Sequence, residues 1–296
     1  MCWREVLALS PESNPGLLVS ADWLQAHLDD PRVHVVDTSV DIVPRPPGPS
    51  DYRSRHPDYL EAHIPGAAYL HMVEDLSDPE GPFPFALPTM EQVSARLRAI
   101  GVSAGDTVVV YGNQIHWATH RCWWVLAVAG VDARVLDCRF DVWVAEGRPT
   151  ETGRPEFTTG DFTASPKDSW VASREDVRAS LDEPGTALIN ALSAEQFAGR
   201  GQPFGRPGRI PGSISVPAAE MIDPSSGAFR AATDLRAAFE ASGAFAYDHL
   251  ITYCGGGIAA STSFLALKLL GYPSVALYDG SLLDWSTDPN LPLIVD

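Results

Sequence analysis

Short apolar runs alternate along this chain with longer stretches in which apolar residues recur every three or four positions. In the second half, β-branched and aromatic runs predict buried strands at "TALIN", "HLITYC" and "SVALYDG". The stretches "TDLRAAFEASG" and "ASTSFLALKLLG" have a helical period and end in a glycine cap. This alternation predicts an α/β fold with a mostly parallel sheet covered by helices on both faces. Ligands in that architecture bind beyond the carboxyl ends of the strands.

The pattern of the second half repeats that of the first. "AHIPGAAYL" recurs as "GRIPGSISV", and a longer stretch beginning "DTVVVYG" recurs as one beginning "DHLITYC". Residues of like character align within this stretch: Tyr111 with Tyr253, Asp137 with Asp279 and Trp143 with Trp285. A repeat of this length indicates a duplication and therefore two tandem domains of one fold.

A segment rich in glycine, proline and threonine, "EGRPTETGRPEFTTGDFTASPKDSW", separates the two halves. It has neither a helical nor a strand period, which is typical of a linker. We therefore predict a first domain over residues 1–154, a linker over 155–167 and a second domain over 168–296.

Composition and charge narrow the classes of partner. With 296 residues and 45% hydrophobic content, the chain is long enough to bury two ordinary cores. The formal net charge of -17 argues against nucleic acid and anionic membranes, because both bind clustered Lys and Arg. No sustained apolar segment follows the start, and no later run approaches the roughly eighteen apolar residues of a membrane span. We therefore expect a cytoplasmic protein.

The cysteines and histidines give no sign of a disulfide or a metal. The four cysteines are Cys2, Cys122, Cys138 and Cys254, and they form no C-x-x-C pair and no zinc-finger spacing. Free thiols of this kind are typical of a reducing compartment. His116 and His120 have the i, i+4 spacing of a zinc-binding helix, but Trp117 stands where such a site needs a glutamate. We expect neither a metal nor a cofactor.

Cys254 differs from the other cysteines because three glycines follow it directly. If a strand ends at Cys254 and a helix starts near Ile258, the glycines are free to curl so that successive N–H groups point inward as an anion nest. The anion would be the sulfur itself, since these amides and the positive end of the helix favour thiolate over thiol. The candidate anion-stabilising loop consists of Gly255, Gly256, Gly257, Ile258 and Ala259.

Two other interpretations of this loop stay open on the residues alone. Cys254 can be a buried thiol that only fills space beside a flexible turn, as free cysteines often do. The glycines can also form a phosphate-binding loop, although neither the P-loop lysine nor a G-x-G-x-x-G spacing is present.

Several of these motifs together resemble those of the tandem-domain rhodanese family, the thiosulfate and 3-mercaptopyruvate sulfurtransferases. They are the paired "HIPG" and "RIPG", the "YDGS" turn before Trp285, the duplication and the "CGGGIAAS" loop, and the resemblance runs from about Leu18 to Leu293. It implies two rhodanese-like α/β domains, of which the first is catalytically silent and the second carries a persulfide-forming cysteine. Gly112 stands where the first half would need its own cysteine.

The resemblance also implies a double-displacement mechanism at an interface between the domains. The Cys254 thiolate would take a sulfane sulfur from a small donor, and an acceptor would then remove the outer sulfur of the resulting persulfide. The implied acceptor is a thiol or cyanide, with a thioredoxin-like protein as a further candidate. No cofactor takes part. Clefts between domains are common ligand sites, and such a cleft would give the silent domain a use.

The donor-binding residues depart from the family pattern. Mercaptopyruvate enzymes usually read C-G-S-G, and here Gly256 replaces the serine; thiosulfate enzymes usually carry Arg and Lys in the loop, and here neither is present. Of the two arginines that bind the mercaptopyruvate carboxylate in the family, Gln196 replaces one and Arg206 is the candidate for the other. Whether Arg209 or His71 contributes is left open. A loop without fixed charge suits one carboxylate better than a dianion, so we expect mercaptopyruvate or another organic thiol rather than thiosulfate.

Two rival functions remain. A cysteine phosphatase, which shares this fold in some members, needs an arginine six positions after the cysteine, where this chain has Ala260. A non-catalytic persulfide carrier or interaction module, with lost donor specificity, is favoured by the departures at Gln196 and Gly256. The resemblance further assigns architectural roles to Asp37 and Asp279. Asn190 aligns with Asp37, and we expect its amide to make the same hydrogen bonds.

Overall fold

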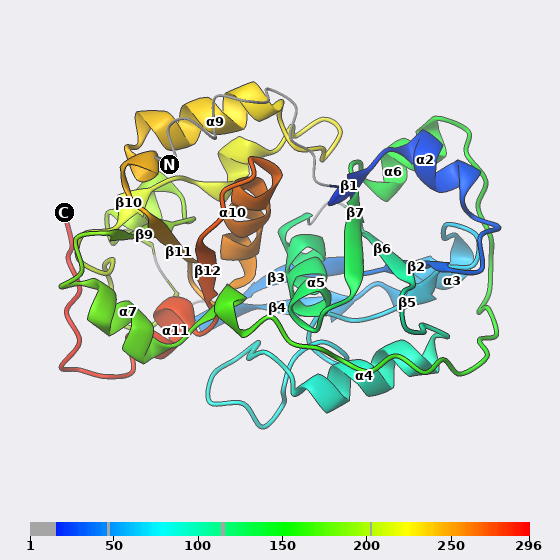
Figure 1. Cartoon of the computed structure of the whole chain (residues 1–296), viewed down its shortest axis with the longest axis horizontal. Coiled ribbons are helices and arrows are strands. Elements are labelled where there is room, and N and C mark those ends of the chain that lie inside the picture. Colours follow the sequence, from blue (N-terminus) through cyan, green and yellow to red (C-terminus); the bar gives the residue numbers. More distant parts are fainter. Residues whose placement is uncertain (1–15, 46–47, 114–115, 202) are drawn as a thin grey trace.

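The computed structural model describes residues 16–45, 48–113, 116–201 and 203–296. They form two α/β domains that lie side by side, and each domain contains one five-stranded parallel sheet (Figure 1). The predicted α/β fold with two tandem domains is therefore confirmed. Cys2 lies outside the described residues.

The first domain has a sheet of strand order β1-β7-β6-β2-β5, in which all neighbours run parallel. Its strands are β1 (Leu18–Val19), β2 (Val33–Asp37), β5 (Ala68–Tyr69), β6 (Thr107–Tyr111) and β7 (Asp132–Leu136). Its helices are α2 (Ala21–Ala26), α3 (His56–Glu61), α4 (Met90–Ala99), α5 (His116–Val128) and α6 (Phe140–Ala145).

The second domain has the parallel order β10-β9-β11-β12-β8, the same topology as the first. Its strands are β8 (Val171–Ala172), β9 (Thr186–Asn190), β10 (Ile214–Ser215), β11 (His249–Tyr253) and β12 (Val275–Tyr278). Its α-helices are α7 (Arg174–Ser180), α8 (Ala194–Phe197), α9 (Ala232–Ala241), α10 (Ile258–Leu269) and α11 (Ser281–Trp285). Three 3-10 turns are η1 (Asp168–Trp170), η2 (Ala218–Met221) and η3 (Ala244–Ala246).

The strands and helices predicted in the second half appear close to their expected positions. Strand β9 coincides with "TALIN", and α9 and α10 are followed by Gly243 and Gly271, both in the left-handed region at φ 79° and 74°. Asn190 accepts a hydrogen bond from Leu192 N–H at 2.9 Å, just as Asp37 accepts one from Ser39 N–H at 2.8 Å. The amide thus takes over the role of the carboxylate, as expected.

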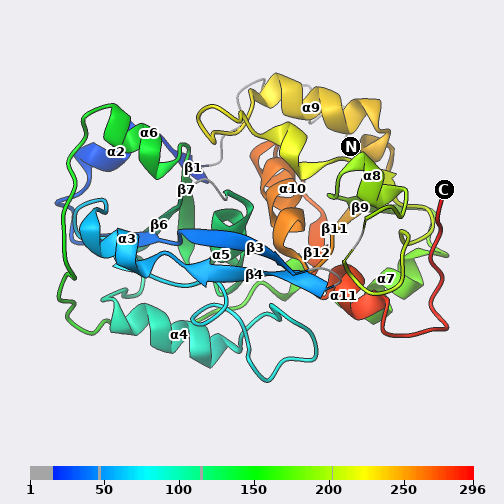
Figure 2. The ribbon, with the colours of Figure 1, turned by 180° about the vertical axis from the view of Figure 1, so that it is seen from behind.

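One element of the first domain has no counterpart among the described strands of the second. Strands β3 (Val40–Arg45) and β4 (Gly48–Ser54) pair antiparallel as a separate two-stranded sheet. The hairpin leaves the first domain and extends toward the second, so that its tip lies near α11 in both views (Figures 1 and 2). The β3–β4 hairpin therefore interrupts the repeat, and it forms an arm of the first domain that extends toward the second.

The two domains meet through α5 and α10, which lie side by side at the centre of the molecule (Figure 1). Almost every side chain of both helices is buried, because each helix is enclosed by its own sheet on one side and by the other domain on the other. Where they cross, His120 Nδ1 and Thr262 Oγ1 are 2.9 Å apart. Because both helices are buried on nearly all sides, neither has a distinct polar face, and neither is clearly amphipathic.

The predicted linker, residues 155–167, contains no helix or strand and follows the surface of the first domain. Backbone hydrogen bonds attach it there, among them Gly160 N–H to Arg98 and Ser165 N–H to Ala129. The exact domain boundaries stay a prediction. Within the described residues, no helix combines the length and apolar character needed to cross a membrane.

Candidate functional site

Cys254 lies at the carboxyl end of β11, and α10 begins four residues later at Ile258. Only 2% of its surface is exposed. The position is the one predicted from the sequence, at the edge of a parallel sheet where βα loops form ligand sites. The chain turns from strand to helix through Gly257, whose φ of 77° lies in the left-handed region that glycine adopts without strain.

Each of the three glycines has a spatial reason to lack a side chain. A Cβ on Gly255 would lie 2.3 Å from the Phe204 ring, and a Cβ on Gly257 would lie 2.6 Å from the carbonyl oxygen of Asp279. A Cβ on Gly256 would lie 2.8 Å from Leu283. The glycines therefore let neighbouring atoms approach the loop closely, and they also let the loop curve. At Gly256, where the family usually has a serine, the space beside Leu283 suits a residue without a side chain.

Ser281 organises the backbone of the cysteine loop. Its hydroxyl oxygen accepts hydrogen bonds from the N–H groups of Cys254 at 3.1 Å and Gly257 at 3.0 Å, and it donates to the carbonyl of Tyr278 at 2.9 Å. The N–H groups of Gly255 and Gly256 have no hydrogen-bond partner in the part of the chain that the structure describes. These two amides are left for an anion on or beside the sulfur. The sequence reasoning missed Ser281, although the "YDGS" motif contains it.

A cation from the first domain lies under the loop. Arg121, on α5, is fully buried; its Nη2 is 2.6 Å from Asp279 Oδ1 and donates to the Phe85 carbonyl at 2.6 Å. Its guanidinium also stacks on Trp124, 4.6 Å from the ring centroid. Nη1 and Nε have no hydrogen-bond partner among the described residues, and Nη1 is 3.1 Å from the place of a Cβ on Gly257. Arg121 thus places beneath the loop a guanidinium whose charge is paired with Asp279 and whose Nη1 lies beside Gly257.

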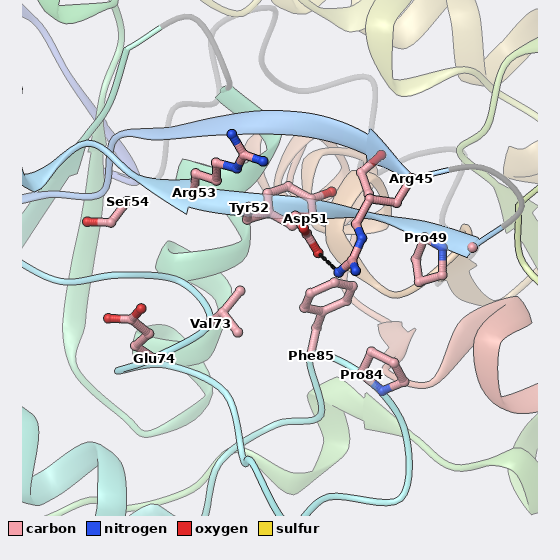
Figure 3. Close-up of a pocket in the computed structure, with 12 residues that line it drawn as sticks. Arg45, Pro49, Asp51, Tyr52, Arg53, Ser54, Val73, Glu74, Pro84 and Phe85 are labelled. Atoms are coloured by element: carbon pink, nitrogen blue, oxygen red, sulfur yellow. Dashed lines mark hydrogen bonds and ion pairs between the residues drawn. The ribbon is translucent and has the colours of Figure 1, made fainter.

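The first domain also provides an aromatic wall beside the loop. Phe85 has a left-handed φ of 65°, and its side chain lies 3.3 Å from the place of a Cβ on Gly256. The Tyr52 ring stands edge-on to the Phe85 ring, with centroids 5.3 Å apart (Figure 3). Burial raises the pKa of Tyr52, and the negative charge of a Cys254 thiolate raises it further. Tyr52 therefore keeps its hydroxyl proton at neutral pH.

The expected donor-binding residues, Arg206 and Gln196, lie on the second domain. Arg206 donates to three backbone carbonyls of the C-terminal segment: Ser286 at 3.1 Å, Asp288 at 2.7 Å and Leu291 at 2.9 Å. Gln196 lies in the short helix α8, which Ser193 caps. The role of both residues in donor binding stays a prediction.

The two residues left open in the sequence have local partners. Arg209 donates to the Phe197 carbonyl at 3.2 Å and pairs with Asp296 at 2.8 Å. His71 is buried, and its Nδ1 accepts the Glu74 N–H at 3.1 Å.

Burial and local contacts hold Cys122, Cys138 and His120 in place. Burial raises the pKa of Cys122 to about 12 and that of Cys138 to about 11, so both remain thiols at neutral pH. His120 is buried, bonded to Thr262 and stacked on Phe229 at 4.9 Å. In the described part of the chain, no group of three His, Cys, Asp or Glu side chains has the arrangement of a metal site.

The loop of the first domain that aligns with the cysteine loop is closed to a side chain. Gly112 occupies the position of Cys254, and a Cβ there would lie 2.2 Å from Thr119 Oγ1. A cysteine at Gly112 therefore requires Thr119 to move. The packing at Gly112 is thus consistent with the expectation that the first domain carries no reactive cysteine.

Comparisons with known proteins agree with this arrangement. The family model described as "Rhodanese-like domain" matches residues 20–146 and 173–288. The 3-mercaptopyruvate sulfurtransferase of Escherichia coli strain K12 is 32% identical over 279 residues, which covers 93% of this chain and 96% of that protein. The sulfur carrier protein TtuD of Thermus thermophilus is 30% identical, over 95% of this chain and 97% of its own.

A solved structure shares the whole architecture. The crystal structure of SseA from Escherichia coli, described as a 3-mercaptopyruvate sulfotransferase with the rhodanese fold, superimposes with a TM-score of 0.77 at 30% identity. The match covers 90% of this chain and 98% of that one. With two matched domains, a common fold and relatives similar over nearly their full length, this chain belongs to the rhodanese-like domain family and is a sulfurtransferase.

Proposed function

We propose that this protein transfers sulfur through a persulfide on Cys254. One observation carries the proposal: Cys254 follows a parallel strand, and the N–H groups of Gly255 and Gly256 beside it have no partner among the described residues. Such amides stabilise negative charge as it develops on sulfur. The buried Arg121 adds a fixed positive charge under the same loop.

A covalent persulfide intermediate splits one difficult sulfur transfer into two easier steps, and the first of these is the attack on the donor. The Cys254 thiolate attacks the donor sulfur, and the new S–S bond forms as the carbon–sulfur bond of the donor breaks. The electron pair of that bond leaves with the carbon as an enolate, which then takes a proton from solvent. The donor's sulfur proton stays on the outer sulfur of the persulfide.

We propose 3-mercaptopyruvate or a related organic thiol as the donor, rather than thiosulfate. Residues 255–259 carry no charged side chain, and the Arg121 charge is already paired with Asp279. One carboxylate is easier to accommodate there than a compact dianion. The relatives named as 3-mercaptopyruvate sulfurtransferases support this choice. A cytoplasmic location, with a thiol, cyanide or a thioredoxin-like protein as acceptor, belongs to the same proposal.

The test is intact-mass measurement after exposure to each donor separately. We expect the mass of one added sulfur atom with mercaptopyruvate and a smaller extent with thiosulfate, and no adduct in Cys254→Ala. The alternative, a persulfide carrier without donor recognition, predicts no adduct from either donor but an adduct from a persulfide-bearing protein. The ratio of kcat/KM for the two donors then measures donor preference, and Arg206→Ala reports whether Arg206 contributes to it.

A further inference from the structure

The chain contains only two lysines, Lys167 and Lys268, and both lie against the same tryptophan. The Nζ atom of Lys167 is 4.4 Å from the centroid of the Trp170 ring, and that of Lys268 is 4.8 Å from it. The two residues are far apart in the sequence. The fold therefore brings two like charges to one aromatic side chain, although each of them could have been placed in solvent alone.

The cluster of Lys167, Trp170 and Lys268 lies where the linker enters the second domain. Lys167 ends the predicted linker, and its N–H donates to the Val128 carbonyl at the end of α5, at 2.8 Å. Trp170 belongs to η1, and Lys268 lies in the last turn of α10. Lys268 is thus about 15 Å along the helix axis from Ile258, where α10 begins beside the cysteine loop. The cluster is separate from the proposed sulfur chemistry.

The lysines take no part in the ion pairs of the described residues, because each of those pairs has an arginine or a histidine as its cation. Lys268 Nζ donates instead to the Pro273 carbonyl at 3.4 Å, and it lies 5.6 Å from the centroid of the Phe264 ring. A carbonyl and two aromatic rings thus surround the Lys268 ammonium group where a carboxylate would stabilise its charge.

The titratable groups that face this cluster come from three elements. On the linker side, Asp132 at the start of β7 attracts Lys167. On the other side, His249 of β11 interacts with Lys268, and it is neutral near pH 7 because burial lowers its pKa. Asp176 and Glu183 act on His249 in turn. Lys167 therefore has a compensating carboxylate nearby, whereas the charge nearest to Lys268 is that of Lys167.

These surroundings favour the neutral amine of Lys268. Contact with the Trp170 and Phe264 rings removes water from the ammonium group, and the like charge of Lys167 repels it. Burial and this repulsion lower the pKa of Lys268 to about 8. Roughly a tenth of Lys268 is then an unprotonated amine at pH 7. A lysine that is desolvated or stands next to another cation is a nucleophile. Because Lys268 is only partly buried, a small reagent can reach it.

We propose that Lys268 is a covalent modification site that takes a small acyl group from an acyl phosphate or an acyl thioester. The lone pair of Nζ attacks the acyl carbon, and a carbon–nitrogen bond forms. The bond from that carbon to the phosphate oxygen or the thiolate sulfur breaks, and its electron pair leaves with the oxygen or sulfur. The surplus proton of the amine passes to solvent.

The uncharged amide that results suits this position. Acylation removes the repulsion between Lys268 and Lys167 and leaves Lys167 alone over the Trp170 ring. A modification that added a negative charge would place it at the C-terminal end of α10, where the helix dipole disfavours an anion. The structure therefore favours a neutral acyl group such as acetyl.

The first test treats the whole protein with acetyl phosphate and, separately, with acetyl coenzyme A, and locates the modified lysine by peptide mapping. At pH 7.5 we expect Lys268 to react about fivefold faster than Lys167 and about tenfold faster than Nα-acetyllysine in the same solution. Its rate should level off above about pH 8, where the amine is already neutral. Reaction with only one donor supports the site and identifies the source of the acyl group.

Two outcomes of this test overturn the inference. One is an equal or faster reaction at Lys167, because the two lysines share the Trp170 ring and differ in their charged neighbours. The other is a Lys268 rate that keeps rising to pH 10, as the rate of Nα-acetyllysine does. With only two lysines in the chain, the peptide assignment is unambiguous.

The second test asks whether the neighbouring charge activates Lys268. Lys167→Gln removes the repulsion, so acetylation of Lys268 at pH 7.5 should slow about threefold and its pH profile should shift upward. Arg200→Gln is the matched control, because it removes one exposed positive charge after α8 and should leave the rate unchanged. Urea unfolding checks that each variant is folded. An unchanged rate in Lys167→Gln, or equal slowing in both variants, contradicts the inference.

Discussion

The carboxylate of Asp279, which follows β12 of the second domain, is held by Arg121 of the first. Nη2 of Arg121 is 2.6 Å from Oδ1, and the Leu87 N–H, also from the first domain, donates to Oδ2 at 2.7 Å. The carbonyl oxygen of the same Asp279 is the atom that a Cβ on Gly257 would strike. One residue thus joins the domain interface to the backbone of the cysteine loop.

Replacing Arg121 by Met should destabilise the fold strongly. The change leaves Asp279 buried without its cation, and breaking a buried pair in this way costs about 3–5 kcal/mol. Urea unfolding of the wild type and the variant measures the difference. The double variant Arg121→Met, Asp279→Asn removes both charges and should recover part of the loss. A single variant as stable as the wild type would show that solvent reaches Asp279.

Gly257→Ala should disrupt the loop more than a glycine replacement elsewhere. Its φ is 77°, and the new Cβ would lie 2.6 Å from a backbone oxygen that cannot move aside. Gly243→Ala is the matched control, because its φ is 79° and nothing lies within 4 Å of its Cβ. We expect a loss of about 1 kcal/mol in the control, from backbone strain alone, and a larger loss with reduced sulfur loading in Gly257→Ala. Equal losses in denaturant titration would count against close approach as the reason for Gly257.

Ser281→Ala should slow persulfide formation. The variant leaves the buried N–H groups of Cys254 and Gly257 without their acceptor, which costs about 1–3 kcal/mol and frees the loop to move. Single-turnover loading, followed by mass spectrometry, should show a rate at least about tenfold lower. Ser281→Thr retains the hydroxyl and tests whether the oxygen alone suffices. Wild-type loading in Ser281→Ala would mean that the two amides are satisfied without Ser281.

Among the cysteines that the structure describes, sulfur loading should be confined to Cys254. The pKa values of Cys122 and Cys138 are raised by burial to about 12 and about 11, so almost no thiolate forms at either residue at pH 8. Peptide mapping after donor treatment and alkylation should place the extra sulfur on the peptide of Cys254 and on neither the peptide of Cys122 nor that of Cys138. Cys138→Ala is expected to load as the wild type does. Sulfur found on Cys138 would contradict the idea that burial keeps it inert.

Stability should decline in mild acid because of His120. Burial lowers its pKa in the folded protein to about 3, whereas the unfolded chain titrates near 6.5. Below pH 6.5 the unfolded state therefore binds the extra proton, and each further pH unit removes about 1.4 kcal/mol of unfolding free energy until pH 3. Denaturant unfolding at pH 7.5 and pH 5 should differ by about 2 kcal/mol more in the wild type than in His120→Gln. An identical pH difference in both proteins would show that His120 takes no part.

The features predicted correctly from the sequence depend on local pattern. The βαβ alternation, the glycine caps and the position of Cys254 each follow from neighbouring residues, and the duplication supported every assignment twice. Ser281 lies in the local motif "YDGS" and could have been found in that way, whereas Arg121 could not. Arg121 stands in the apolar helix "HWATHRCWWVLAV", where nothing local indicates that it crosses to the other domain. Its aligned residue in the second half, Ser263, carries no charge.

The hairpin and the contacts of the candidate donor-binding residues were harder to predict from the sequence, for a related reason. "SVDIVPRPPGPSDYRS" contains prolines and charges in place of a clear strand alternation, and no repeat supports it. Arg206 is a candidate because of its place ahead of "RIPG", and its role in donor binding stays a prediction; the bonds of its guanidinium to carbonyls of a segment some eighty positions later in the chain could not be predicted from that motif. Contacts of that sequence separation depend on the finished fold, and a local pattern does not encode them.

The interface between the domains has the symmetry of a homodimer. The Phe229 N–H donates to Asp137 at 2.9 Å, which mirrors the bond from Leu87 to Asp279, and His120 faces its own repeat equivalent Thr262 across α5 and α10. An isologous contact of this kind is how two identical subunits associate about a two-fold axis. The two halves of one chain therefore meet as two like subunits do, and the pseudo-symmetry breaks at Gly112, at Arg121 and at the β3–β4 arm, which are present in the first half alone among the described residues.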